Sequence, residues 1–262
     1  MMDKTLYDEM CGAFFPVFKK LSATDVYSIT LGGSHGKGIS DLNSDFDFRI
    51  YYEKPVENDI RTLVFDEVKA LCAEWKEKGV KVDGIFPRAY ADVDEQLDLW
   101  MSGKGKPVPY TWTVWGYHIL TDIYHQQILE DTHGKAAEWK ERLAVYPAAL
   151  KESLIKHHGS SLEYWKNDYH YKNKVDRKDV VFLNSVTNRL IHDMIQVVYA
   201  LNEFYYPGDG MNLEYTQRFK LKPGNFEERI TAILQSYEYA EQYNNIIGLI
   251  NDTLLLVKNN TI

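Results

Sequence analysis

The sequence predicts an α+β protein with two domains, a sheet-containing domain followed by a helical one. Before residue 146, short runs of β-branched and aromatic residues alternate with helical patterns, whereas the later chain has almost only helical periodicity. The length of 262 residues, with 45% hydrophobic residues, is enough for one large or two medium domains. We place the boundary at Tyr146-Pro147, which gives domains of residues 1–146 and 147–262.

The first predicted strand, Tyr27–Leu31, leads into a glycine-rich turn over Gly32–Gly38. The glycines let the backbone approach a ligand closely, and successive N–H groups can hold phosphate oxygens. Ser34 adds a hydroxyl donor, and Lys37 is either a countercharge for phosphate or a solvated loop residue. The turn lacks the Gly-Lys-Ser/Thr ending of a Walker motif, so we expect a different kind of phosphate site.

A strand of alternating acidic and aromatic residues, Asp45-Phe46-Asp47-Phe48, follows the turn. Side chains alternate between the two faces of a strand, so we expect Asp45, Asp47 and Arg49 on one face and the aromatic residues in the core. Two carboxylates on one strand suit a hard divalent cation such as Mg²⁺, which prefers carboxylate oxygens and bridges to phosphates. The pattern therefore predicts a metal site beside the glycine-rich turn.

A further acidic residue lies on the next predicted strand. The spacing predicts a helix over Glu57–Lys78, ended by Gly79, and then a strand over Val80–Phe86. On this strand Asp83 shares a face with Ile85. Asp83 is either part of the site or an aspartate exposed to water at the end of the strand.

The pairing of Gly33-Ser34 with Asp45-Phe46-Asp47-Phe48 resembles the signature of the polymerase-beta-type nucleotidyltransferase superfamily. In that signature, Gly-Ser is followed after about ten residues by Asp-hydrophobic-Asp-hydrophobic. The resemblance implies a mixed sheet flanked by helices, two Mg²⁺ ions and a nucleoside triphosphate such as ATP as substrate. It also implies a third carboxylate on a later strand after a connecting helix, for which Asp83 is our candidate. Asp45, Asp47 and Asp83 would then be catalytic and bind the metal, with Asp83 either a ligand or the base toward an acceptor hydroxyl.

The layout of the whole chain most resembles two-domain aminoglycoside and lincosamide nucleotidyltransferases. This resemblance implies transfer of AMP, or another nucleoside monophosphate, to a hydroxyl of a small molecule such as an antibiotic. Two alternatives stay open: AMP transfer to a protein hydroxyl, as in AMP-transferring antitoxins, and a non-catalytic nucleotide sensor. The residues expected to bind nucleotide are Gly33, Ser34, Lys37, Arg49, Lys220 and Lys222.

In the second half of the sequence, the spacing of apolar residues predicts three long helices, over Ala148–Asn167, Lys178–Tyr206 and Phe226–Val257. We expect these helices to form a bundle. The segment Pro207-Gly208-Asp209-Gly210 is expected to end the second helix. The structure of Trp112–Tyr124 stays undecided between added strands and a docking helix.

Polar side chains recur every four residues on the second of these helices, at Asn184, Asn188, His192 and Gln196. This row either faces the cleft between the domains and contacts nucleotide or acceptor, or it is an outward stripe or an internal hydrogen-bond network. Lys220 and Lys222 either reach the triphosphate, as basic residues of related helical domains do, or belong to a solvated basic loop.

Composition excludes several classes of protein. The net charge of −8 argues against a general nucleic-acid binder, which needs a basic face. Two cysteines, Cys11 and Cys72, give neither a disulfide framework nor metal-ligand spacing, so we expect a reducing cytoplasm. No apolar run approaches the length of a membrane span, so we expect no membrane partner.

Overall fold

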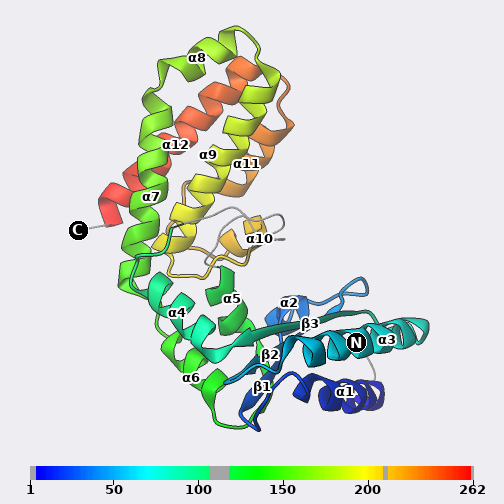
Figure 1. The fold of residues 1–262 in the computed structure, drawn as a ribbon. Helices are drawn as coiled ribbons and strands as arrows, with labels where there is room; N and C mark the ends of the chain where they lie inside the picture. Colours follow the sequence, from blue (N-terminus) through cyan, green and yellow to red (C-terminus); the bar gives the residue numbers. More distant parts are fainter. Residues whose placement is uncertain (1–3, 107–117, 209–211, 261–262) are drawn as a thin grey trace. The chain divides into compact units, whose positions relative to one another are not determined.

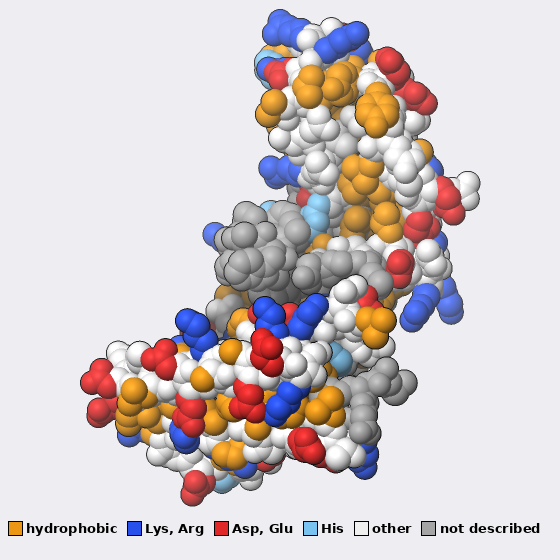
Figure 2. All heavy atoms as spheres, turned by 90° about the vertical axis from the view of Figure 1, so that its right-hand side faces the viewer, with side chains coloured by type: hydrophobic (Ala, Val, Ile, Leu, Met, Phe, Trp, Pro, Cys, Tyr) orange, Lys and Arg blue, Asp and Glu red, His pale blue; other side chains and the backbone are white. Residues whose placement is uncertain are grey.

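The computed structural model describes residues 4–106, 118–208 and 212–260, and it is an α+β protein (Figure 1). The described chain divides into two compact units. The first takes the described residues of Met1–Leu99 and Ile119–Val145, and the second takes those of Trp100–His118 and Tyr146–Ile262. On the face drawn in Figure 2, acidic and basic side chains are interspersed over both units.

The first unit contains a mixed four-stranded sheet in the order β3-β2-β1-β4. Strand β1 pairs antiparallel with β2 and β4, whereas β2 and β3 are parallel. A parallel pair needs a crossover connection, and the long helix between β2 and β3 supplies it. The strands are β1 (Tyr27–Leu31), β2 (Phe46–Tyr52), β3 (Val82–Ala89) and β4 (Gln127–Asp131). The predicted first strand is therefore confirmed.

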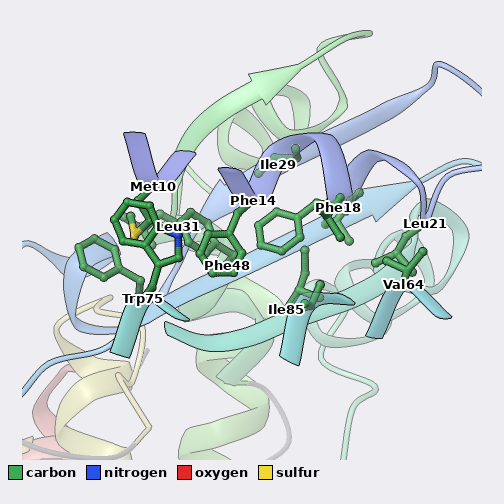
Figure 3. Close-up of a cluster of buried hydrophobic side chains, with 14 of the residues drawn as sticks. Met10, Phe14, Phe18, Leu21, Ile29, Leu31, Phe48, Val64, Trp75 and Ile85 are labelled. Atoms are coloured by element: carbon green, nitrogen blue, oxygen red, sulfur yellow. The ribbon is translucent and has the colours of Figure 1, made fainter. Parts of the chain in front are cut away.

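Helices α1 (Lys4–Lys19) and α3 (Asn58–Glu77) pack against each other and against the sheet. The prediction of α3 is confirmed, and Gly79, with φ +81°, follows its end. Aromatic side chains fill the core beneath these helices, where the Phe14 ring stacks on Phe48 with centroids 6.1 Å apart (Figure 3). Burial of such side chains contributes roughly 1.5–3 kcal/mol each, which fixes one face of β2 toward the core.

The prediction that Asp83 shares a face with Ile85 is wrong. Strand β3 begins at Val82, and Asp83 is exposed whereas Ile85 is buried, so the two residues do not share a face. The pairing explains this, because Phe46 lies opposite Val82 but Phe48 lies opposite Ile85, which leaves one extra residue on β3. Such a bulge breaks the alternation of side chains, and Gly84, with φ +93°, accommodates it.

Three further helices and one short helical turn complete the first unit. The glycine-rich segment predicted as a turn folds as the short helix α2 (Gly33–Lys37). The others are α4 (Tyr90–Met101), α5 (His118–His125) and α6 (Lys135–Arg142). Residues 112–117 of the undecided segment lie outside the described residues, and the remainder from His118 belongs to α5.

In the second unit, α7 (Ala148–Asn167) and α12 (Tyr239–Asn260) pack on α9 (Val180–Leu201) and on each other. The prediction of α7 is confirmed. Helix α9 is shorter than predicted at both ends, and Asp209 and Gly210 of the expected stop lie outside the described residues. The unit also contains α8 (Tyr169–Asp176), α10 (Asn212–Thr216) and α11 (Phe226–Gln235).

The single last helix predicted over Phe226–Val257 is wrong, because α11 and α12 are separate. Ser236 has extended dihedral angles, φ −75° and ψ 130°, which end α11. The chain then reverses within three residues, and the Gln242 side chain donates a hydrogen bond to the carbonyl of Ile233, which also accepts the backbone N–H of Ser236. Because the connection is so short, the helical spacing of apolar residues continues from α11 into α12, and the sequence pattern alone predicts a single helix. None of the described helices combines the length and hydrophobicity required to cross a lipid bilayer.

Candidate active site

The glycine-rich turn lies directly against the acidic strand. Gly32 donates its backbone N–H to the Asp47 carbonyl at 2.9 Å. Gly33 has φ +57°, and a Cβ atom placed on it would lie 1.8 Å from Asp47 Oδ2. Any side chain at residue 33 would therefore displace the carboxylate as well as strain the backbone. The position of the Asp47 carboxylate therefore depends on the glycine at residue 33.

Asp45 lies immediately before β2, so the prediction that it occupies the strand is wrong by one residue. Within β2 the predicted alternation holds, because Phe46, Phe48 and Ile50 are buried whereas Asp47 and Arg49 are partly exposed. The core contacts of the aromatic residues thereby fix Asp47 and Arg49 on the opposite face.

The carboxylates of this region repel one another. Burial raises the pKa of Asp47 to about 6, and the negative charges of Asp45, Asp122 and Asp83 add to this shift, whereas Arg49 opposes it. Burial also raises the pKa of Asp83, again with a contribution from Asp45. Each shift means that the folded protein disfavours the charged form of these groups. A cation bound among them would relieve the repulsion.

The donors have the chemistry that Mg²⁺ requires, since they are carboxylate oxygens in partial burial. Among the residues that the structure describes, however, no three or more His, Cys, Asp or Glu side chains are arranged as a group that could hold a metal ion. Asp45 and Asp47 follow one another along a single segment, and Asp83 lies on the neighbouring strand, where its charge adds to the raised pKa of Asp47. The oxygen donors of the site are thus of the kind that binds such a cation. Asp45 and Asp47 are the residues that would hold it.

Arg49, predicted to bind nucleotide, makes a two-pronged ion pair with Asp122 of α5. Its Nε lies 3.0 Å from Asp122 Oδ2, and its Nη2 lies 3.2 Å from Oδ1. Both side chains are nearly buried, with exposed fractions of 11% and 12%. The guanidinium also lies 3.7 Å from Asp47 Oδ1 and 4.6 Å over the Phe86 ring. Arg49 therefore contacts two carboxylates of the region at once.

Asp122 is a residue of the site that sequence reasoning missed. It lies within the segment that stayed undecided, and no motif or spacing connects it to the acidic strand. Its helix is tied to the sheet by the residue that follows the helix, because Gln126 Oε1 accepts hydrogen bonds from Thr30 at 2.7 Å and Tyr51 at 3.0 Å. Lys140 donates to the carbonyls of Tyr124 and Gln126, which holds the end of α5.

The remaining turn residues surround the same region. The Ser34 hydroxyl makes no hydrogen bond to a residue that the structure describes, whereas the His35 ring stacks on Phe46 with centroids 4.0 Å apart. Burial lowers the pKa of His35, although Asp45 acts in the opposite direction. The positive charge of Lys37 contributes to the lowered pKa of His125, whose main cause is burial. The Ser34 hydroxyl can therefore donate a hydrogen bond to a bound ligand.

The predicted polar row of the helical unit lies along α9. Asn184 and Asn188 are exposed, and their side-chain amides donate to backbone carbonyls one turn earlier, of Val180 and Asn184. His192 is partly buried and shares a hydrogen bond of 3.0 Å with Gln196. Burial lowers the pKa of His192 to about 2, which keeps its ring neutral. Part of the predicted polar row is therefore satisfied within the helix itself.

The two predicted lysines differ from each other. Lys220 is exposed, and its backbone N–H bonds to the Asn202 side chain. The Lys222 ammonium instead lies 2.7 Å from the Glu227 carboxylate, in a pair that is mostly buried. Lys222 is thus engaged in an ion pair of its own unit.

Comparison with known proteins gives one partial match. The profile of a family described as a domain of unknown function (DUF4037) matches residues 112–210. This segment contains Asp122 and the first three helices of the helical unit, and it lies outside the glycine-rich turn and the acidic strand. A search of curated proteins found no match. The matched segment covers less than half of the chain and carries no described activity.

Proposed function

We propose that the protein is a Mg²⁺-dependent nucleotidyltransferase that moves AMP, or another nucleoside monophosphate, from a triphosphate to a hydroxyl of a small molecule. The contact between Gly33 and Asp47 carries this proposal. A phosphate-binding turn packed onto a carboxylate brings phosphate oxygens beside the oxygens that would hold their counter-ion. A solvated hairpin has no need for a glycine at the position where a Cβ would displace that carboxylate.

Asp45 and Asp47 would hold Mg²⁺, which when bound neutralises charge on the triphosphate. The backbone of the turn and the Ser34 hydroxyl would bind the outer phosphates. In the transfer, the acceptor oxygen bonds to the α-phosphorus, and the bond from that phosphorus to pyrophosphate breaks. The hydroxyl proton passes to a carboxylate oxygen of Asp83. Catalysis of this kind depends mainly on positioning and charge neutralisation.

We assign this chemistry to the sheet-containing unit, which we propose has a nucleotidyltransferase-like arrangement joined to a helical bundle. Lys220, Asn188 and His192 of the helical unit are proposed contacts for nucleotide or acceptor. We propose an antibiotic as the first acceptor to test, because the layout of the chain resembles that of aminoglycoside and lincosamide nucleotidyltransferases.

A second candidate is a nucleotide sensor without turnover. It is favoured by one observation, the lack of a three-residue metal-binding group among the described side chains. A sensor would bind a nucleoside triphosphate through the glycine-rich turn and release no pyrophosphate.

The test uses the purified protein with Mg²⁺, each nucleoside triphosphate in turn, and aminoglycoside and lincosamide acceptors. We expect acceptor-dependent release of pyrophosphate, and we expect Asp47→Asn to lower its rate on the order of 10³-fold, since charge stabilisation at the reacting phosphate is lost. Asp94→Asn is the matched control, because Asp94 is paired with Arg142 away from the turn. Calorimetric binding of a triphosphate without turnover would favour the sensor, and absence of both would refute the proposal.

A further inference from the structure

We propose that Asp122 is a positioning residue that sets the affinity of the acidic strand for its divalent cation by holding Arg49 away from Asp47. The inference rests on the proposed function, because it concerns the same metal site. Arg49 lies between two carboxylates that compete for it. Asp122 takes the hydrogen-bonding contacts at 3.0 and 3.2 Å, whereas Asp47 keeps only a charge contact at 3.7 Å.

The geometry makes Asp122 the stronger partner. Two N–H groups of a guanidinium fit the two oxygens of one carboxylate, and such forked pairs are the most directional of ion pairs. The pair is nearly buried, so water does little to weaken it. Asp47 receives no hydrogen bond from Arg49 at its distance, which leaves the Asp47 oxygens available to a metal.

The surroundings keep Arg49 in this position. Gly32 backs the pair so closely that a Cβ on it would lie 2.8 Å from Asp122 Oδ1 and 3.1 Å from the Arg49 guanidinium. The Phe86 ring covers the guanidinium at 4.6 Å. Helix α5 is in turn fixed at its end, where Lys140 donates to the Gln126 carbonyl at 2.6 Å. Asp122 is therefore presented from a rigid support.

Removing Asp122 should change what Arg49 does. The guanidinium keeps its charge at any ordinary pH, so it would turn to the nearest remaining carboxylate, Asp47. A cation would then have to displace an ion pair before it could bind. A loss of Asp122 therefore weakens metal binding only while Arg49 is present, which distinguishes this role from a simple loss of negative charge.

The experiment is a double-mutant cycle that measures binding of Mn²⁺ alone by electron paramagnetic resonance of the free ion. We expect Asp122→Asn to weaken Mn²⁺ binding about tenfold in the wild-type background, the change that 1.4 kcal/mol produces. In an Arg49→Gln background the same substitution should change binding less than about twofold. Equal effects in both backgrounds would overturn the inference while leaving the proposed function intact.

Two further variants keep the test decisive if Asp122→Asn does not fold. Arg49→Lys preserves the charge but cannot make the forked pair, so it should weaken Mn²⁺ binding, and unchanged binding would overturn the inference. Asp122→Glu keeps a carboxylate at this position, so its dissociation constant for Mn²⁺ should lie within about threefold of the wild-type value. Asp94→Asn, which removes an equal charge elsewhere in the unit, should leave binding unchanged. If the wild type binds no Mn²⁺, the metal site of the proposed function fails and this inference fails with it.

Discussion

Each unit of the protein contains a nearly buried aspartate that is paired with a basic side chain, and these two pairs differ in their surroundings. In the sheet-containing unit, Asp122 pairs with Arg49 beside a glycine-rich turn and other carboxylates. In the helical unit, Asp193 of α9 pairs with His158 of α7 at 2.7 Å, with exposed fractions of 3% and 0%. The second pair lies between two helices that pack closely on one another.

The difference indicates what each pair does. The Arg49 pair lies beside charges of one sign that the fold brings together at a cost in free energy, as the raised pKa of Asp47 indicates. The His158 pair joins two helices through one short hydrogen bond, and the second Asp193 oxygen has no hydrogen-bond partner among the described residues. We therefore expect the first pair to matter mainly for function and the second mainly for stability.

The largest stability effect should come from breaking the helical pair. Asp193→Ala leaves His158 buried without its Nδ1 partner, which should lower the free energy of unfolding by about 3 kcal/mol. Urea unfolding measures the change. Asp176→Ala is the control, because its pair with Lys172 is exposed and should be worth less than about 0.5 kcal/mol. Equal effects of the two substitutions would remove the distinction between buried and exposed pairs.

A matched pair of glycines separates backbone strain from damage to the site. Gly33→Ala and Gly134→Ala both place a side chain at positive φ, +57° and +73°, which costs about 1–2 kcal/mol each. A Cβ at Gly134 meets nothing within 4 Å, whereas a Cβ at Gly33 meets Asp47. Only Gly33→Ala should therefore lower pyrophosphate release, on the order of 10²-fold. Similar activity of the two variants would contradict the assigned site.

The pH dependence of stability tests the repulsion at Asp47. Its folded pKa of about 6 lies above the ordinary value of 3.8, so the folded state binds more protons between these values. Stability from this group is therefore present at low pH and is lost as pH rises through about 6. We expect the difference in unfolding free energy between wild type and Asp47→Asn to change by about 2 kcal/mol from pH 4 to pH 7, allowing for solvent screening.

The sign of this change in unfolding free energy with pH decides whether the repulsion at Asp47 exists. The wild type should lose stability relative to Asp47→Asn as pH rises. A constant difference, or a gain for the wild type, would mean that Asp47 is stabilised in its charged form and that the repulsion inferred for the site is absent. Asp94→Asn provides the reference for removal of an aspartate outside the acidic region.

The smallest effects are expected at the two lysines of the helical unit. Lys222→Gln breaks the contact with Glu227 and should cost about 1 kcal/mol, measured by urea unfolding. Lys220→Gln should stay within about 0.5 kcal/mol, because the Lys220 side chain is exposed. If Lys220 binds the triphosphate, its substitution should raise KM for the nucleotide and leave kcat unchanged. A change of stability with unchanged KM would make it a structural residue.

Elements whose signals are local could be predicted from the sequence. The bounds of β1 and α7 agree with the structure, because a β-branched run ending in glycine and a helical pattern after proline are signals contained in the segment itself. The alternation in β2 held for the same reason. Predictions failed where one residue changed the pattern, at the bulge beside Gly84 and at Ser236 between α11 and α12.

The sequence by itself determined β1, α3 and α7, the alternation in β2, and the spacing of the glycine-rich turn from Asp45 and Asp47, since each depends on neighbouring residues. The tertiary structure alone decided that Gly33 lies on the Asp47 carboxylate, that the bulge beside Gly84 buries Ile85 and leaves Asp83 exposed, and that Arg49 pairs with a residue 73 positions away. An ion pair depends on distance in space, and no local pattern records which of many aspartates the fold brings within 3 Å of a guanidinium.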